Sequence, residues 1–519
     1  PLCSDWMRLR LAMNMLKISK AIFRSLLSSR SLCVVVVALM VLCALPVFRS
    51  AAGIDGRVEY LEQARERVRN RRIRRTAVLL VLLFALMLLW GYLGGQTGFF
   101  YQNSDWGYRN AIYRDLITNS WPVYYPQKDT ALVYYIGHWL VPAALTKPVY
   151  ALFGLDAAWM FARMALWGWT ALGTYLAALN LLVYLRADTG KKQGIGLLFL
   201  IFFSGMDILG ALYSSRLPDL LAYDAMHLEW WTNDFQFSSL TTCLFWVFNQ
   251  TVGAWLATVC FLQEKDCRNY LLLGTACLMC GPFPFVGLVI FMVVRGIVLL
   301  AQRQKGVLQS AFSPANVLVL VVVLSITASY FLANNAFGYS VLGETVAGNQ
   351  AAQQTFGQNV LTSLQKGMLV FYLLDAGIYL LLLWRQNRRS WLLYTCAVSL
   401  FIIPFFKVGQ GCDFCMRVSI PAIFILMTLC ARYFIALVGT KWRDGTLAQH
   451  AVTILLAATL LIGACTPAME IYRGICHIAK EGTFCLENEE PYTLADRPVS
   501  LNFETQNCEN KLFFTYFAK

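Results

Sequence analysis

Repeated apolar runs of membrane-spanning length dominate this sequence and leave few folds open to it. Such runs can be drawn at 31–48, 76–95, 158–184, 194–214, 238–262, 315–337, 366–384, 390–407, 417–438 and 450–469. Residues 270–302 are long enough for two short helices broken at Gly281-Pro282-Phe283-Pro284. Because about 20 apolar residues cross a bilayer as a helix, the sequence predicts an all-α polytopic membrane protein with about 11–12 transmembrane helices.

The composition agrees with this class. The chain of 519 residues is 58% hydrophobic and only 14% charged, whereas soluble domains carry roughly 25% charged residues. The formal net charge of +14 would also suit a nucleic-acid-binding protein. The basic residues instead cluster at the ends of apolar runs, as at 65–75, 265–268, 385–389 and 441–443. That distribution is typical of the positive-inside rule, so we expect membrane lipid as a partner and no nucleic acid.

The basic clusters also predict an orientation. If 65–75 is cytoplasmic, the first span exits and a long first outer loop follows at 96–157. The loops at 186–193, 263–269, 303–305, 385–390 and 441–450 then all lie inside, and all contain Lys or Arg, the residues that the positive-inside rule counts. This holds only if the apolar stretch 134–155 does not cross the membrane, so we predict juxtamembrane helices in the first outer loop. The other predicted outer loops are 215–237, 338–365 and 408–416.

The ends of the chain frame a transmembrane domain at 76–469. A basic N-terminal region, 1–75, contains the hydrophobic segment 31–48, which is either an uncleaved signal-like hairpin or part of a translated extension. A short tail at 470–519 is predicted on the outer face. Cysteines on that face, such as Cys412 and Cys415, are either free or paired in disulfides.

Asp105 is the candidate catalytic residue of the first outer loop. Transfer of a sugar to a hydroxyl or amine requires a general base, and one carboxylate suffices. The alternative is that the 103–105 segment only caps a helix. Capping leaves the neighbouring side chains unexplained, and we expect these to contact the sugar: Trp106, Tyr108, Asp115, Tyr124 and Tyr125.

Arg417 is the candidate phosphate-binding residue. A guanidinium binds phosphate oxygens bidentately and keeps its charge, so Arg417 could hold the phosphate of a lipid carrier. The alternative is an arginine that snorkels or simply pairs with Asp413. Arg163 and Lys366 are weaker candidates for the same role.

The segment 227–256 begins polar and aromatic and then enters the membrane with polar side chains. Glu229, Trp230 and Gln250 are predicted to contact substrate, as is Asp413. The alternatives are an interfacial aromatic belt and hydrogen bonds that join helices. Asp207 and Asp375 lie within apolar runs, where a carboxylate is either functional or structurally paired.

The order of an acidic loop after the first exit helix, WPVYY, YYIGHWLVPAAL and then FAR resembles the membrane glycosyltransferases of the GT-C fold. That superfamily includes the bacterial aminoarabinose transferases and the protein O-mannosyltransferases. The resemblance covers about 76–190 and implies a sugar donor on a polyprenyl phosphate. It places the catalytic acid of the first loop at Asp105 and the arginine opening the next span at Arg163. Many members have two adjacent acids there, whereas Trp106 follows Asp105, which leaves dependence on Mg²⁺ or Mn²⁺ open.

The sequence therefore predicts an inverting glycosyltransferase whose acceptor is a glycan, a lipid or a protein. We expect it in the bacterial cytoplasmic (inner) membrane, with its active site facing the periplasm. A transporter or flippase of lipid-linked saccharides is the first alternative, and an outer-leaflet glycan polymerase or ligase is the second. No nucleotide-binding glycine loop supports an ATP-driven pump.

Overall fold

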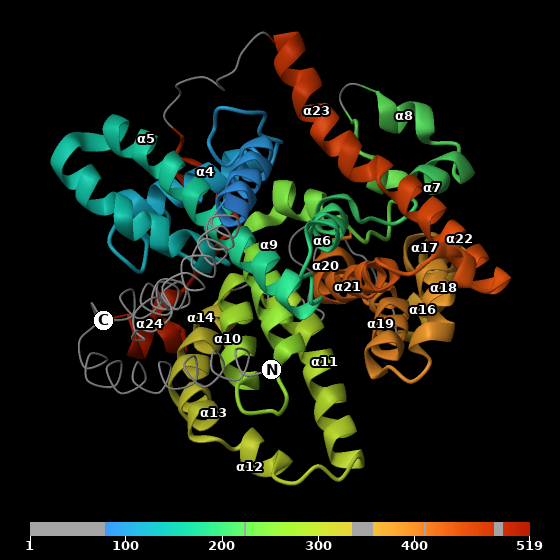
Figure 1. The fold of residues 1–519 in the computed structure, drawn as a ribbon. Helices are drawn as coiled ribbons and strands as arrows, with labels where there is room; N and C mark the ends of the chain where they lie inside the picture. Colours follow the sequence, from blue (N-terminus) through green and yellow to red (C-terminus); the bar gives the residue numbers. More distant parts are fainter. Residues whose placement is uncertain (1–77, 223–224, 335–355, 409–411, 482–490, 519) are drawn as a thin grey trace, which may run out of the picture.

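The computed structural model describes residues 78–518, except 223–224, 335–355, 409–411 and 482–490 (Figure 1). The N-terminal region 1–75 with its hydrophobic segment 31–48 lies outside the described residues, as does most of the predicted outer loop 338–365.

The described part of the chain is a multi-pass, almost entirely helical membrane protein, as predicted. Eight of its helical segments are long and apolar enough to cross a membrane, and three shorter apolar helices accompany them. The eight are Gly137–Tyr184, Gly190–Tyr213, Leu240–Gln263, Pro282–Ala301, Val307–Leu332, Met368–Asn387, Ile420–Leu437 and Leu447–Lys480. The shorter three are Val78–Leu93, Tyr270–Cys280 and Trp391–Phe405.

The helices of the first half are α4 (Trp106–Thr118), α5 (Gly137–Tyr184), α6 (Gly190–Phe202), α7 (Asp207–Tyr213), α8 (Leu217–Leu221), α9 (Leu240–Gln263), α10 (Tyr270–Cys280) and α11 (Pro282–Ala301). Those of the second half are α12 (Val307–Ala311), α13 (Pro314–Leu318), α14 (Ser325–Leu332), α16 (Phe356–Gln365), α17 (Met368–Tyr372), α18 (Ile378–Asn387), α19 (Trp391–Ile402), α20 (Asp413–Val418), α21 (Ile420–Leu437), α22 (Leu447–Gly463), α23 (Cys465–Glu481) and α24 (Leu512–Tyr516). π-Helical turns at Val319–Leu324 and Leu373–Gly377 interrupt two of the spans.

The break predicted in 270–302 is confirmed. Helix α10 ends at Cys280, Gly281 is extended, and α11 begins at Pro282. Proline suits the first position of a helix, where its missing N–H would have no partner. The break therefore follows from the local sequence.

Helix α5 bends sharply at Gly154, whose φ of 78° and ψ of −177° are not helical. A positive φ costs glycine little because it has no Cβ. The bend separates the stretch that we assigned to the first outer loop from the span predicted at 158–184. Leu152 and Phe153 beside it are 75% and 69% exposed, as expected of a helix that rests against lipid. The position of this stretch outside the membrane stays a prediction.

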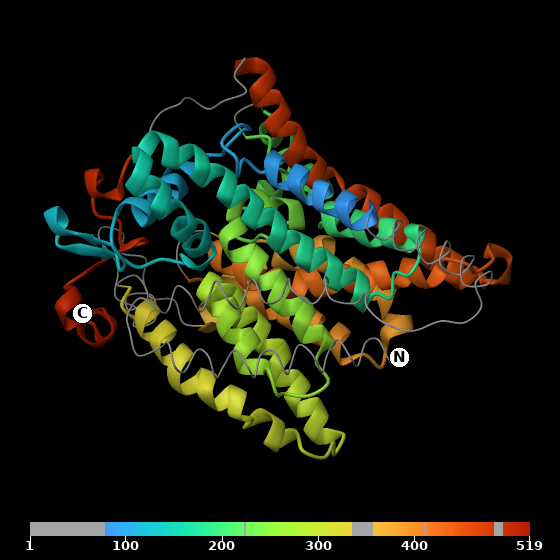
Figure 2. The ribbon, with the colours of Figure 1, turned by 60° about the vertical axis from the view of Figure 1, so that its left-hand side comes forward.

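Helix α9 lies in the middle of the bundle, where it packs on α5, α10, α11 and α21 (Figures 1 and 2). Its helical geometry breaks at Val247, where φ is −135°. The break divides α9 into two parts, and the polar residues Asn249 and Gln250 lie just after it.

A small antiparallel sheet, absent from our sequence prediction, joins the C-terminal tail to the first outer loop. Its strands are β1 (Tyr124–Tyr125), β2 (Thr130–Leu132) and β3 (Glu504–Gln506), in the order β1-β2-β3. Thr130 pairs with Gln506, and Tyr124 with Ala131. The strands project at one end of the bundle (Figure 2). Residues 470–481 continue α23, so the predicted tail begins later than expected and its last part folds back onto the first loop.

Candidate functional site

Five segments that are far apart in the sequence meet around the break in α9. They are the start of α4, residues 134–137 before and at the start of α5, the part of α9 after its break, the Gly281 break, and α20. The Asn249 side chain donates to the Tyr135 carbonyl over 3.5 Å. A Cβ on Gly137 would lie 2.4 Å from the Met279 carbonyl, and one on Gly281 would lie 2.9 Å from the Gln250 side chain. These contacts fix the backbone around a common polar centre.

Asp105 lies at the N-terminal end of α4 with half of its side chain exposed. Its carboxylate accepts a hydrogen bond from Arg109 over 2.7 Å, in an i,i+4 ion pair. The Asp105 side chain makes no capping hydrogen bond to α4, although an N-cap carboxylate normally accepts one from the first turn. Helix α4 nevertheless begins directly after Asp105, and the Asn103 side chain accepts a hydrogen bond from the Asp105 N–H over 3.1 Å. The 103–105 segment therefore does start a helix, as the capping alternative expects, while the Asp105 carboxylate itself pairs with Arg109. Its part as a catalytic base stays a prediction.

Arg109 is the buried partner in this pair. Its guanidinium lies 5.9 Å from the Trp106 ring centre and 6.0 Å from that of Phe248. One terminal nitrogen, Nη1, has no hydrogen-bond partner among the described residues. Burial lowers the pKa of Arg109, while Asp105 opposes that shift. A buried guanidinium nitrogen without an acceptor is costly, so Arg109 has capacity for an anionic or hydroxyl oxygen of a ligand.

Arg417 on α20 is the second cationic side chain of the site, after Arg109. It pairs with Asp413 over 3.0 Å, and its side chain is 13% exposed. Burial alone would lower the pKa of Arg417, but Asp413 and Tyr135 outweigh burial and raise it. Asp105 and Tyr134 also act on the Arg417 charge. We call Asp105, Arg109, Tyr134, Tyr135, Gln250, Asp413 and Arg417 the polar site.

Gln250 completes this site on the side of α9. Its side chain is only 1% exposed, and neither its amide nitrogen nor its amide oxygen has a hydrogen-bond partner among the described residues. Buried amides almost always have partners, so an unpaired one next to a polar cluster is a place for a ligand. Trp106 belongs to the same wall, because it stacks on Phe248 with ring centres 5.0 Å apart.

An apolar groove of about 690 Å³ leads to α20 along the outside of the bundle. Residues of α11 and α19 line it, as do Phe414 and Val418. Both residues are on α20, the helix that carries Arg417. The ring of Phe414 also contacts Phe283 at the start of α11, with centres 5.5 Å apart. A lipid chain in this groove would contact α20, the helix that carries Arg417.

Asp115 and Tyr125, which we predicted to contact the substrate, make buried structural contacts instead. Asp115 is fully buried, and its Oδ2 accepts hydrogen bonds from the Tyr125 hydroxyl and from the Leu494 backbone N–H, both over 2.9 Å. Burial raises the pKa of Asp115. These contacts attach the tail to α4, so we remove both residues from the candidate site.

Tyr108 and Tyr124 are partly exposed but also face the tail. The Tyr108 ring stacks on Phe503 at 5.1 Å, and the Tyr124 ring lies 5.5 Å from Phe514. They form an aromatic surface where the first loop meets the tail. Contact between this surface and a sugar stays a prediction.

Glu229 and Trp230 belong to another cluster. The Glu229 carboxylate is buried and accepts hydrogen bonds from the Ser238 hydroxyl over 2.6 Å and the Ser239 N–H over 2.9 Å, which fixes the start of α9. Trp230 packs on His227, with ring centres 4.4 Å apart. Asp207, within its span, accepts from Ser204 and Thr466, so this intramembrane carboxylate has structural partners.

Lys366 and Arg163 also have other neighbours. Lys366 pairs with Asp234 over 2.6 Å. Arg163 lies over the Phe99 ring at 5.0 Å. Arg109 and Arg417, which lie near one another, are therefore the residues on which we base the phosphate role, and the parts predicted for Lys366 and Arg163 stay predictions.

Among the described residues, no group of three or more His, Cys, Asp or Glu side chains is arranged to hold a metal ion. Magnesium is often held by one or two carboxylates together with substrate phosphates. Asp105 and Asp413 are the carboxylates of the polar site that could take part in such a shared arrangement. The described cysteines, including Cys412 and Cys415, are not paired in disulfides.

Sequence reasoning missed Arg109, Tyr134 and Tyr135. One signal was present for Arg109, since Asp105 and Arg109 have the i,i+4 spacing at which opposite charges pair on a helix. The two tyrosines precede α5 and reach Arg417 only through the tertiary fold.

Comparisons with protein-family models, with curated proteins and with solved structures give no match. The class of this protein, a multi-pass α-helical membrane protein, therefore rests on its own sequence and structure.

Proposed function

We propose that this chain is a membrane glycosyltransferase of the GT-C kind. It would transfer a sugar from a polyprenyl-phosphate-linked donor to a glycan, lipid or protein on the outer face of the bacterial cytoplasmic membrane. The observation that carries this proposal is that Asp105 and its partner Arg109 lie near Arg417, which is far from them in the sequence. Arg417 is on α20, a helix that also lines an apolar groove.

In the proposed step, the acceptor hydroxyl attacks the anomeric carbon of the sugar. Its proton passes to the carboxylate of Asp105 as the new glycosidic bond forms. The bond between that carbon and the phosphate oxygen breaks, and the electron pair stays on the phosphate. Arg417 stabilises the phosphate as it leaves, and Arg109 is free to bind it once acceptor binding displaces Asp105. A single displacement of this kind inverts the configuration of the sugar.

The apolar groove supports a lipid-linked donor. An isoprenoid chain between α11 and α19 would be buried in the groove that Phe414 and Val418 also line. The phosphate would then lie by Arg417, one helical turn beyond Phe414. Gln250 would meet a sugar hydroxyl, because its buried amide has no protein partner among the described residues.

A transporter or flippase is the second candidate, because discontinuous helices are typical of transporters. Here α9 breaks at Val247, the Gly281 break follows α10, and a π-helical turn carries the buried Asp375. An outer-leaflet glycan polymerase or ligase would use the same chemistry as the leading proposal with a glycan acceptor.

Donor turnover separates the two classes. The purified protein in lipid nanodiscs is incubated with a panel of labelled polyprenyl-phosphate sugars and a membrane extract as acceptor. A transferase releases one polyprenyl phosphate for each sugar transferred. Binding of the donor without cleavage of the sugar–phosphate bond, combined with movement of intact donor across proteoliposomes, would favour the transporter.

Arg417→Gln is expected to weaken donor binding about 10- to 100-fold, because hydrogen bonds to charged groups contribute about 1.5–3 kcal/mol. The measurement is the donor Kd in nanodiscs. Arg443→Gln serves as the control, since Arg443 lies in a loop predicted on the opposite side of the membrane. An unchanged Kd in Arg417→Gln would show that the donor phosphate binds elsewhere.

A further inference from the structure

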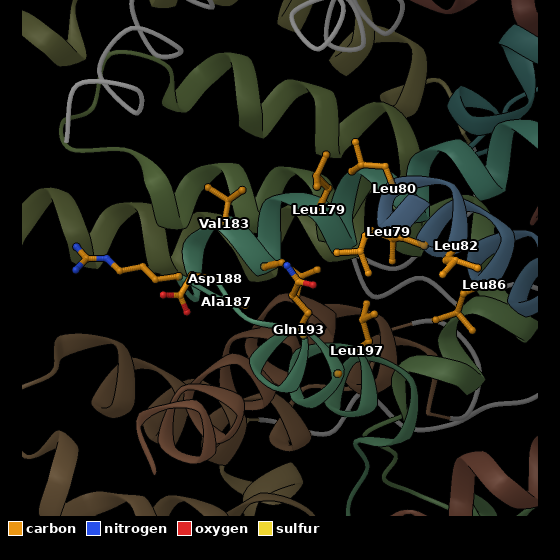
Figure 3. Close-up of a pocket in the computed structure, with 15 residues that line it drawn as sticks. Leu79, Leu80, Leu82, Leu86, Leu179, Val183, Ala187, Asp188, Gln193 and Leu197 are labelled. Atoms are coloured by element: carbon orange, nitrogen blue, oxygen red, sulfur yellow. The ribbon is translucent and has the colours of Figure 1, made fainter. Parts of the chain in front are cut away.

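A second groove lies at the opposite, predicted inner side of the membrane, and the proposed transferase reaction makes no use of it. It has a volume of about 570 Å³. Its walls come from the helix Val78–Leu93, the last turns of α5, and α6 (Figure 3). The wall residues are Leu79, Leu80, Leu82, Leu83, Leu86, Leu179, Leu182, Val183 and Leu197. This lining suits an aliphatic chain.

One end of the groove is polar. Figure 3 shows Asp188 at this end, while Leu82 and Leu86 lie at the other. Arg186 and Gln193 also line it. The Asp188 carboxylate is already paired with Lys192 over 2.7 Å, whereas Arg186 is exposed and has no ion-pair partner among the described residues. The groove therefore combines an apolar interior with an arginine at its mouth, Arg186, that has no ion-pair partner among the described residues.

The positive charge at the mouth of the groove favours a lipid with an anionic headgroup over one with a zwitterionic headgroup. The loop 186–193 contains three basic residues, Arg186, Lys191 and Lys192, against one acidic residue, Asp188. Our topology places this loop on the cytoplasmic side, where anionic lipids attract basic residues. Gly190 and Gly194 line the same groove, and a Cβ on either would meet nothing within 4 Å.

We propose that this groove is a binding site for an anionic phospholipid of the inner leaflet. One acyl chain would lie between the helix Val78–Leu93, α5 and α6, and the phosphate headgroup would bind Arg186, with Lys191 close by. The proposal is independent of the transferase reaction, so loss of one does not affect the other.

Two substitutions test the binding of the lipid headgroup and of its acyl chain separately. Arg186 has a φ of 54°, and asparagine tolerates this left-handed backbone better than most residues, so Arg186→Asn removes the charge with little strain. Gly194→Leu places a side chain in the groove, and it fits a helix better than glycine. The controls are Arg303→Asn, at an exposed arginine that also has a φ of 54°, and Gly168→Leu, at another glycine with open space around its Cβ position.

The measurement is native mass spectrometry of full-length protein released from nanodiscs with equal amounts of phosphatidylglycerol and phosphatidylcholine. We expect the wild type to retain phosphatidylglycerol preferentially. Arg186→Asn should reduce that preference about fivefold, which corresponds to about 1 kcal/mol per basic residue, and Gly194→Leu should remove the retained lipid. Both controls should behave as the wild type.

Equal retention of the two lipids by the wild type would overturn the proposal, as would an equal effect of Arg303→Asn. If no retained lipid is displaced by Gly194→Leu, the groove is not a lipid site. In that case the residues before position 78, which adjoin its first wall in the sequence, become the better occupant.

Discussion

Asp105→Asn is expected to slow sugar transfer by about 10²- to 10⁴-fold, the usual contribution of a general base. Asparagine has nearly the same shape, and its amide oxygen can still accept the hydrogen bond that Arg109 donates to Asp105 over 2.7 Å. It cannot take up the proton of the acceptor. The donor Kd should therefore stay within about threefold while the transfer rate falls, because the lost interaction exists only in the transition state.

Asp129→Asn provides the matched control for this variant. Asp129 is an exposed carboxylate in the same predicted outer loop, and its left-handed backbone, with a φ of 50°, suits asparagine. Transfer by Asp129→Asn should equal that of the wild type. If Asp105→Asn transfers sugar at the wild-type rate, Asp105 is not the base and Asp413 is the next carboxylate to test.

Glu504→Ala is expected to destabilise the docked tail by about 3–5 kcal/mol, the cost of removing one partner of a buried ion pair. The Glu504 carboxylate is fully buried in strand β3. It pairs with Lys128 over 2.7 Å and accepts a hydrogen bond from the Thr130 hydroxyl over 2.6 Å. Its removal leaves the Lys128 ammonium, 11% exposed, without its carboxylate.

Hydrogen exchange of the β2 and β3 amides measures this effect, since exchange through tail release should speed up by about 10²- to 10⁴-fold for that loss of free energy. Glu509→Ala, at an exposed acid of the same tail, should leave the exchange rates unchanged. Equal protection of β2 in Glu504→Ala and the wild type would mean that the tail is not held by this ion pair.

The helices could be predicted because their signals are local. Apolar runs of spanning length mark them, and Gly281 with Pro282 marks the break between α10 and α11. The sheet could not be predicted in this way. Strands of two or three residues are too short to show an alternating pattern, and β3 pairs with residues more than 370 positions earlier in the chain.

The polar site was predictable only in part, for a similar reason. Asp105 was recognisable as an acid of the long first outer loop, and Arg417 as a cation at the outer end of an apolar run. That they lie near one another is a property of the tertiary fold, because more than 300 residues separate them in the sequence. Asp115 was predicted to contact the sugar because it lies in the same loop, but its carboxylate is buried and accepts a hydrogen bond from the Leu494 N–H.

An outer-face transferase requires the polar site to face the outer side of the membrane. Single cysteines at Gln127→Cys in the first loop and Arg389→Cys in a basic loop test this in sealed, right-side-out vesicles with a membrane-impermeant maleimide. Modified peptides are identified by mass, so that the native cysteines do not interfere. We expect labelling at position 127 in intact vesicles and at position 389 only after permeabilisation. Labelling of position 389 from outside, with position 127 protected, would contradict the orientation and with it an outer-face transferase.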